Sequence, residues 1–128
     1  MYQCKTHPIQ SRKAKRVIAE ANRLLSSRRQ ASRGSRPYVR VKFLGKGRKR
    51  VFIEDVHYHI DEKSFRDMVG RYRLLPCVWE LLRHTTDTPE PTPRGNLKLI
   101  GMTPEGESFA VIIRPEKEGG VLQSFYPL

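Results

Sequence analysis

Residues 97–126 read LKLIGMTPEGESFAVIIRPEKEGGVLQSFY, and this stretch decides the fold class of the chain. Three runs rich in β-branched and aromatic residues occupy positions 97–102, 108–114 and 121–126. Sequences typical of turns, Pro-Glu-Gly-Glu and Glu-Lys-Glu-Gly-Gly, separate them. The stretch therefore predicts three antiparallel strands joined as a meander.

Before the meander, the sequence predicts two further strands. Residues 39–43 alternate apolar and cationic side chains, and residues 50–60 continue an extended pattern after a glycine-containing turn at 45–49. The two strands are expected to form a hairpin. In the second of them, His57 and His59 are two positions apart and are expected to share one face.

The remaining segments predict helices and loops. Apolar residues at helical spacing indicate an amphipathic basic helix over about 10–28, and a polar, glycine-containing linker follows at 26–37. Asp61 is expected to cap a second helix, and Pro76 suits the first turn of a third. The three prolines in residues 85–95 predict an extended loop.

Together these elements predict an α+β protein. It would have an N-terminal basic helix and an antiparallel sheet of four to five strands, which includes the C-terminal three-stranded meander, with helices packed on one face. We expect a basic helix and flexible linker at residues 1–36 and a single α+β domain at residues 37–128. A length of 128 residues, 38% of them hydrophobic, is consistent with one modest core.

Charge is distributed very unevenly along the chain. Residues 1–50 contain 16 Lys and Arg and one acidic residue, Glu20, whereas residues 51–128 contain 9 Lys and Arg and 12 acidic residues. A cationic segment of this kind favours a polyanionic partner, because each neutralised phosphate releases condensed counterions. Nucleic acid is the partner we expect; an anionic membrane surface, an acidic protein or a role in solubility alone are the alternatives.

Most of the N-terminal cations are predicted to contact phosphates, which fixes position without reading sequence. The predicted nucleic-acid-binding residues are Arg12, Lys13, Lys15, Arg16, Arg23, Arg28, Arg29, Arg40, Lys42, Lys46, Arg48, Lys49 and Arg50, with Lys5 beside them. Tyr38, Tyr58 and Tyr72 are candidates for stacking on bases, while Phe43 and Trp79 are expected in the core.

Targeting and cofactor motifs are not evident in the sequence. There is no apolar signal region or long hydrophobic run, and two widely spaced cysteines, Cys4 and Cys77, make no disulfide framework. We therefore expect a reducing, cytoplasmic location and no membrane association. No P-loop, Rossmann glycine pattern, paired carboxylates or nucleophile elbow is present, so no cofactor is expected.

The histidines could carry acid–base chemistry. An imidazole has an unperturbed pKa of about 6.5, so His57 and His59 can accept or donate a proton near neutral pH. The alternatives are two solvent-facing histidines without a role, or a zinc site that combines them with Cys4 and His7. No metal is our prediction.

The last two strands offer a second polar group. Ser124 and Tyr126 share one face of the final strand, and Arg114 ends the strand before it. Hydroxyls and a guanidinium on one sheet surface can hold a phosphate. The alternative is that Tyr126 is ordinary packing and Ser124 an ordinary exposed residue.

The last 70 or so residues resemble a known family. The segment VHYHIDEKSFRDMVGR is followed by LKLIGMTPEGESFAVIIRPE and a closing VLQSFYPL. This order is similar to the barnase–EndoU–colicin–RelE-like ribonucleases, in their phage-associated or small-toxin branches. Those proteins have a G-x-T-x-x-G-x-x-F-x-V-like strand pair before a final strand that ends in a polar residue, any residue, and Tyr-Pro. Ser124 departs from the pattern, where Thr is commoner, as do the proline-rich loop and the basic N-terminal extension.

The resemblance implies a metal-independent endoribonuclease, and a protein that neutralises the toxin as a partner. Carried over by position, its site would comprise His57 or His59, a helix arginine at Arg66 or Arg71, and Ser124 with Tyr126. Arg114 is a further candidate for stabilising charge on the phosphate.

Two other functions fit the same charge pattern. One is a non-catalytic RNA- or ribosome-binding protein, for which the cationic N-terminal region alone is sufficient. The other is a DNA-associated regulator that places the basic helix in a groove.

Overall fold

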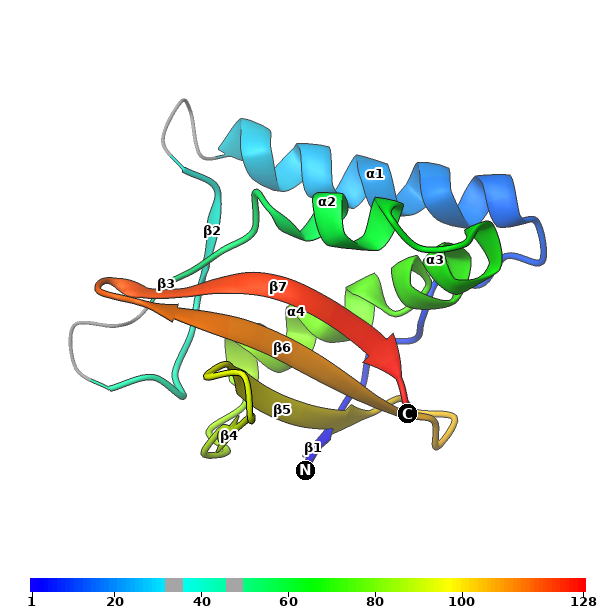
Figure 1. The fold of residues 1–128 in the computed structure, drawn as a ribbon. Coiled ribbons are helices and arrows are strands. Elements are labelled where there is room, and N and C mark those ends of the chain that lie inside the picture. The colour runs from blue at the N-terminus through cyan, green and yellow to red at the C-terminus, as the bar shows by residue number, and fades with distance from the viewer. Residues whose placement is uncertain (32–35, 46–49) are drawn as a thin grey trace.

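The computed structural model describes residues 1–31, 36–45 and 50–128, and within them it has four helices and a curled mixed sheet. The predicted α+β class is therefore confirmed (Figure 1). The central strands β5 (Leu97–Met102), β6 (Ser108–Glu116) and β7 (Gly119–Pro127) pair antiparallel in sequence order. This is the predicted meander, with β6 and β7 each extended by one to three residues.

The sheet is larger than predicted, and its strands are not all antiparallel. Its described strands number seven, in the order β1-β5-β6-β7-β3-β2, with β4 (Glu90–Pro91) also paired to β5. β1 (Tyr2–Gln3) runs parallel to β5, and β3 (Arg50–Phe52) runs parallel to β7. β2 (Tyr38–Arg40) pairs antiparallel with β3, as the hairpin prediction required. Of the turn expected between them at residues 45–49, all but Gly45 lies outside the described residues.

The first helix is longer at its C-terminal end than the sequence predicted. α1 spans Ala14–Ala31, so it continues through half of the segment that was expected to be a linker. Residues 32–35 lie outside the described part of the chain. Val17, Ala21 and Leu25 are buried at helical spacing in the same core as the sheet residues. Helix α1 thus shares one core with the sheet.

The prediction of a strand at His57 and His59 is wrong, because this segment is helical. β3 ends at Phe52, and α2 covers Val56–Asp61. Val56 and Ile60 are both fully buried, and their spacing of four residues puts them on one side of a helix. Residues two apart in a helix point in different directions, so the two histidines do not share a face.

Two short helices follow. α3 (Phe65–Tyr72) is capped by Ser64, whose side chain accepts a hydrogen bond from the backbone of the third helical residue, and not by Asp61 as predicted. Asp61 instead accepts a hydrogen bond of 2.7 Å from the hydroxyl of Tyr72. α4 (Leu75–His84) has Pro76 in its first turn, as expected. None of the helices in the described residues combines the length and the apolar character needed to cross a bilayer.

The two faces of the meander differ. On one face, Leu81 of α4 and Phe109 approach Gly101 so closely that a β-carbon there would lie within 2.7 Å of both side chains. Phe125 is fully buried on this side. In Figure 1, α4 lies behind the sheet and α1, α2 and α3 lie beyond β7, which leaves the near face of β5–β7 without a helix. Ser124 and Tyr126 alternate with Phe125 and therefore lie on this open face.

Candidate functional site

A pocket of about 360 Å³ lies on the open face beside β7. It is bounded by the end of α2 and the loop after it, by the turn between β4 and β5, and by β6 and β7. We call it the Ser124 pocket, and its lining residues are His59, Lys63, Thr92, Arg94, Asn96, Ile112, Gln123, Ser124 and Tyr126.

Arg71 lies next to this pocket and is held in place by three groups. Its Nη1 donates a hydrogen bond of 2.8 Å to Oγ of Ser124, and its Nε donates one of 3.1 Å to Asp67. Its guanidinium carbon also lies 5.4 Å from the ring centre of Tyr126, within the range of a cation–π contact. Only 15% of the side chain is exposed. The guanidinium is therefore fixed beside the hydroxyl of Ser124 before any ligand arrives.

An irregularity in β7 brings two consecutive side chains to the same pocket. Leu122 pairs with Ile113 and Ser124 pairs with Ile112, so Gln123 has no residue directly opposite it. Such a β-bulge redirects side chains, and bulges are frequent beside active sites. Gln123 and Ser124 both line the pocket, although neighbours on a regular strand would face opposite ways. Oε1 of Gln123 is buried and makes no hydrogen bond within the described structure.

The Ser124 pocket is cationic. Lys63 and Arg94 line it, and none of the described residues that line it is Asp or Glu. Arg94 is presented by a tight turn, in which the backbone N–H of Gly95 donates to the carbonyl of Thr92 at 3.0 Å. Gly95 has a φ of 81°, a backbone conformation that glycine adopts without strain. The pocket thus suits an anion.

The structure brings together four of the seven predicted catalytic residues. His59, Ser124 and Tyr126 line the pocket, and Arg71 is bonded to Ser124. The other three lie elsewhere. His57 stacks on the ring of Tyr58, with ring centres 3.9 Å apart, Arg66 is exposed on α3, and Arg114 pairs with Asp55 at 3.5 Å.

Sequence reasoning missed Lys63, Thr92, Arg94 and Asn96. Thr92 and Arg94 come from the proline-rich segment, and Asn96 follows it directly. The extended loop predicted there is irregular at residues 85–89, as expected, and then forms β4 and a turn into β5. The Pro-Arg-Gly sequence at 93–95 is a turn signal that presents one cation. No signal in the sequence places that turn beside β7, because the two are close only through the fold.

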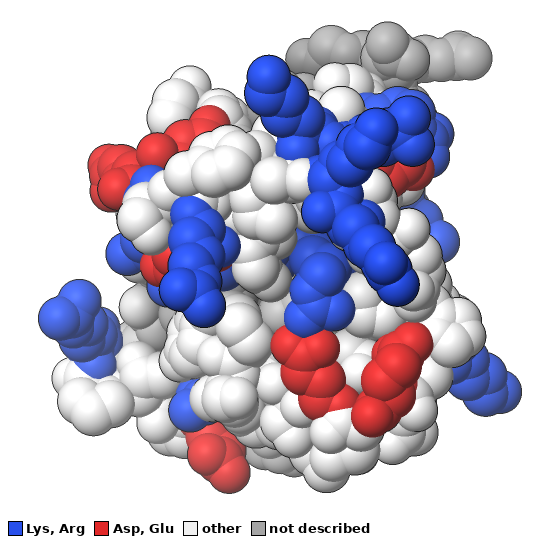
Figure 2. Space-filling view, turned by 90° about the vertical axis from the view of Figure 1, so that its right-hand side faces the viewer, with Lys and Arg blue, Asp and Glu red and all other residues white. Residues whose placement is uncertain are grey.

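The cations predicted to contact phosphates form an exposed surface along α1. Val17, Ala21 and Leu25 occupy the buried side of the helix, which leaves the cations on the solvent side. In Figure 2, Lys and Arg gather at the height of α1, and acidic residues lie below them on the same face. We call this set the α1 cationic surface; its exposed members are Arg12, Lys13, Lys15, Arg16 and Arg23.

The other predicted contacts are more scattered. Arg40, Lys42 and Arg50 are exposed at or near β2 and β3, and Arg28 is half-buried. The side chain of Arg29 and residues Lys46, Arg48 and Lys49 lie outside the described part.

The aromatic residues divide differently from the prediction. Tyr72 is buried and cannot stack on a base, whereas Tyr58 is 63% exposed. Tyr38 is half-buried between the ring of Phe52 and the guanidinium of Arg50. Trp79 and Phe43 pack against the core but are only partly buried, and Trp79 lines a second pocket described below.

The alternative zinc site is not assembled. Cys4 is buried, where its Sγ donates to the carbonyl of Cys77 at 3.5 Å, and His7 pairs with Glu105. Both cysteines are free thiols. Over residues 1–31, 36–45 and 50–128, no three His, Cys, Asp or Glu side chains are placed to share a metal ion.

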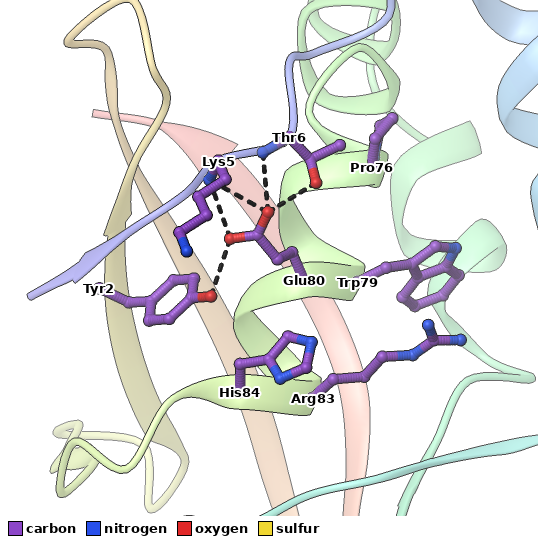
Figure 3. A pocket seen from close by; sticks show the side chains of 8 residues that line it. All are labelled: Tyr2, Lys5, Thr6, Pro76, Trp79, Glu80, Arg83 and His84. Carbon is purple, nitrogen blue, oxygen red and sulfur yellow. Dashed lines mark hydrogen bonds between the residues drawn. The ribbon is translucent and has the colours of Figure 1, made fainter.

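A second pocket, of about 540 Å³, lies between β1 and the outer side of α4. At its centre the carboxylate of Glu80 accepts hydrogen bonds from the backbone N–H groups of Lys5 and Thr6, at 3.0 and 2.7 Å (Figure 3). The hydroxyls of Thr6 and Tyr2 donate to it as well, at 2.6 and 2.8 Å. Burial would raise the pKa of Glu80, but these hydrogen bonds outweigh burial and lower it. Glu80 therefore ties the first strand to α4 as a carboxylate.

Replacing Glu80 by glutamine should lower the free energy of unfolding by about 2 kcal/mol at pH 7, because an amide cannot accept all of these hydrogen bonds. The pKa of Glu80 is lower in the folded than in the unfolded chain, so its stabilisation is complete above the ordinary value of 4.5 and is lost as the pH falls below it. Urea unfolding at pH 7 and pH 3.5 measures how much the free energy of unfolding of Glu80→Gln differs from that of the parent. This difference should be smaller at pH 3.5, and the exposed Glu118→Gln serves as the control. An equal difference at both pH values would contradict a stabilising role for the ionised Glu80.

Comparisons of the chain with protein-family models, with curated proteins and with solved structures found no match.

Proposed function

We propose that the protein is a metal-independent endoribonuclease whose active site is the Ser124 pocket together with Arg71. The observation that carries the proposal is the hydrogen bond of 2.8 Å from Arg71 to Ser124, at a pocket that His59 and Tyr126 also line. A guanidinium, a hydroxyl and an imidazole at one cationic pocket can supply the proton transfer and charge stabilisation that metal-independent phosphodiester cleavage uses.

The size and charge of the pocket support a phosphodiester substrate. About 360 Å³ is within the range of small-ligand sites, and it holds one nucleotide unit but not a duplex. Lys63 and Arg94 add two cations to that of Arg71. Asp67, the carboxylate nearest Arg71, is engaged by that guanidinium through two hydrogen bonds.

In the proposed reaction, the 2′-hydroxyl oxygen of RNA attacks the adjacent phosphorus, and the bond from phosphorus to the 5′-oxygen breaks. The products are a 2′,3′-cyclic phosphate and a free 5′-hydroxyl. The 2′-hydroxyl loses a proton and the departing 5′-oxygen gains one; His59 carries out one of these two transfers, as general base or as general acid, and water carries out the other. Arg71 stabilises the charge that develops on the phosphoryl oxygens, and Ser124 with Tyr126 orients them. The α1 cationic surface supplies affinity for the rest of the strand.

An end-labelled RNA and a copy with one 2′-deoxy position, both incubated in EDTA, test the proposal. The protein should cleave the RNA to cyclic phosphate ends and spare the bond that follows the deoxy position. Arg71→Ala should reduce the cleavage rate by about 10²- to 10³-fold. Arg66→Ala removes an exposed arginine from the same helix and should leave the rate unchanged. RNA that is bound but stays intact with the parent protein rules the proposal out.

A second candidate is a non-catalytic RNA-binding protein, which the α1 cationic surface favours. Arg12, Lys13, Lys15 and Arg16 have no acidic partner among the described residues. A filter-binding salt titration against RNA and duplex DNA of equal length distinguishes this candidate, and a DNA-binding role, from the nuclease. Salt-dependent affinity for RNA without cleavage supports it.

Two further features belong to the same proposal. We place the reaction in the cytoplasm, where two free buried cysteines remain reduced. A protein that neutralises the nuclease is the partner that the family resemblance suggests, in addition to RNA.

A further inference from the structure

We infer that the second pocket, between β1 and α4, binds a nucleobase with its phosphate, as one unit of a single-stranded nucleic acid. We call it the Trp79 pocket, and its lining residues are Tyr2, Lys5, Thr6, Pro76, Trp79, Glu80, Arg83 and His84. It belongs to a different part of the molecule from the Ser124 pocket, because α4 covers the opposite face of the meander. The inference goes beyond the proposed function and does not depend on it.

The Trp79 pocket pairs an aromatic surface with cations. Trp79 and Arg83 are four residues apart on α4, and in Figure 3 they extend side by side from the helix. Lys5 lies across the pocket from them, and His84 follows Arg83 at the end of α4. An indole offers a stacking surface to any base, and a guanidinium beside it can pair with the attached phosphate. This combination is typical of sites that bind single strands without reading their sequence.

The carboxylate of Glu80 lies in the same pocket and keeps its negative charge. Its two oxygens accept hydrogen bonds from four groups of β1 and the residues after it, two backbone N–H groups and the hydroxyls of Tyr2 and Thr6. The side chains of Lys5 and Arg83, both exposed and without an acidic partner among the described residues, outnumber it, so the pocket keeps a net positive charge for a phosphate.

Folding explains only part of this arrangement. Basic residues in the last turn of a helix interact favourably with its dipole, which accounts for Arg83 and His84. Trp79 packs against the core yet stays partly exposed beside a pocket of about 540 Å³. Its exposed portion is therefore available to stack on a base.

Trp79 is the sole tryptophan of the chain, so its fluorescence reports on this pocket alone. We expect a ten-residue oligodeoxythymidylate, which lacks a 2′-hydroxyl and cannot be cleaved, to quench this fluorescence saturably at low salt. Arg83→Ala should weaken the quenching about tenfold and lower the salt dependence by about one counterion, while Arg66→Ala should change neither. Thymidine monophosphate distinguishes a strand from a free nucleotide. If the oligonucleotide quenches the fluorescence at concentrations where the mononucleotide causes no quenching, the ligand is a strand. If both quench equally, the ligand is a free nucleotide.

Two outcomes would overturn the inference. One is oligonucleotide binding, seen by anisotropy of a labelled strand, that leaves the tryptophan fluorescence unchanged. The other is an equal effect of Arg83→Ala and Arg66→Ala. Trp79→Phe, which keeps an aromatic ring, should retain most of the anisotropy signal, whereas Trp79→Ala should weaken binding roughly tenfold or more. Because the probe contains no cleavable bond, these results are independent of whether the Ser124 pocket cleaves RNA.

Discussion

Replacing His59 by alanine should reduce the rate of RNA cleavage by about 10²- to 10⁴-fold, the usual contribution of a general acid or base. His59 is the histidine that lines the Ser124 pocket, and it lies there with Ser124 and Tyr126. The measurement is the single-turnover rate on a labelled RNA in EDTA. Affinity for the uncleavable 2′-deoxy strand should change little, because the α1 cationic surface is unaltered.

His57→Ala is the matched control, because it removes the same side chain from the same helix two residues away. His57 stacks on Tyr58 and does not line the pocket, so its loss should change the rate by less than about threefold, within ordinary surface effects of about 0.5 kcal/mol. Circular dichroism of both variants verifies that they fold. If His57→Ala proves the more damaging change, the assignment of His59 is wrong.

Gly119→Ala should lower the free energy of unfolding by roughly 3 to 5 kcal/mol, since strain and overpacking each contribute about 1–3 kcal/mol. Gly119 has a φ of 144°, and a β-carbon added there would lie 2.0 Å from the carbonyl oxygen of Arg50. Arg50 is its partner in the parallel pairing of β3 with β7. Neither a flexible side chain nor a small shift can relieve a clash with paired backbone. A loss of this size is a large part of the total stability of a domain, about 5–15 kcal/mol.

Gly70→Ala is the opposite control. Gly70 lies within α3, and a β-carbon there would meet no atom within 4 Å. Alanine is the better helix former, so this variant should gain about 0.5–1 kcal/mol. Urea denaturation of the parent and both variants measures the three values. If Gly119→Ala unfolds at the same urea concentration as the parent, then β3 does not pair with β7 as described.

The meander could be predicted from the sequence because its strands are long and its turns carry clear signals. The helix at VHYHI could not be predicted, because a segment of five residues fits both the two-residue period of a strand and the 3.6-residue period of a helix. Val56, Tyr58 and Ile60 alternate as in a strand, but Val56 and Ile60 are also one helical turn apart, and burial of both selects the helix. β1 and β4 were missed because two-residue strands leave no periodic pattern.

The candidate site was predicted as a set of residue types rather than as a geometry. Ser124 and Tyr126 could be placed on one face because a strand has a fixed period. The choice between Arg66 and Arg71, or between His57 and His59, depends on how α2 and α3 pack on β7. Lys63 and Arg94 reach the pocket from positions that are 31 residues apart in the chain, and no local pattern relates them.

The parallel pairing of β1 with β5 has a consequence for how the molecule is made. Tyr2 pairs with Gly101, 99 positions further along the chain. Contacts between residues so far apart in the chain form slowly, because closing the loop between them costs conformational entropy before the contact contributes any stabilising energy. A nascent chain therefore emerges with its first strand unpaired, and β1 can dock only after the meander exists. In native-state hydrogen exchange, the amide of Cys4, bonded to the carbonyl of Met102, should open before those of β6.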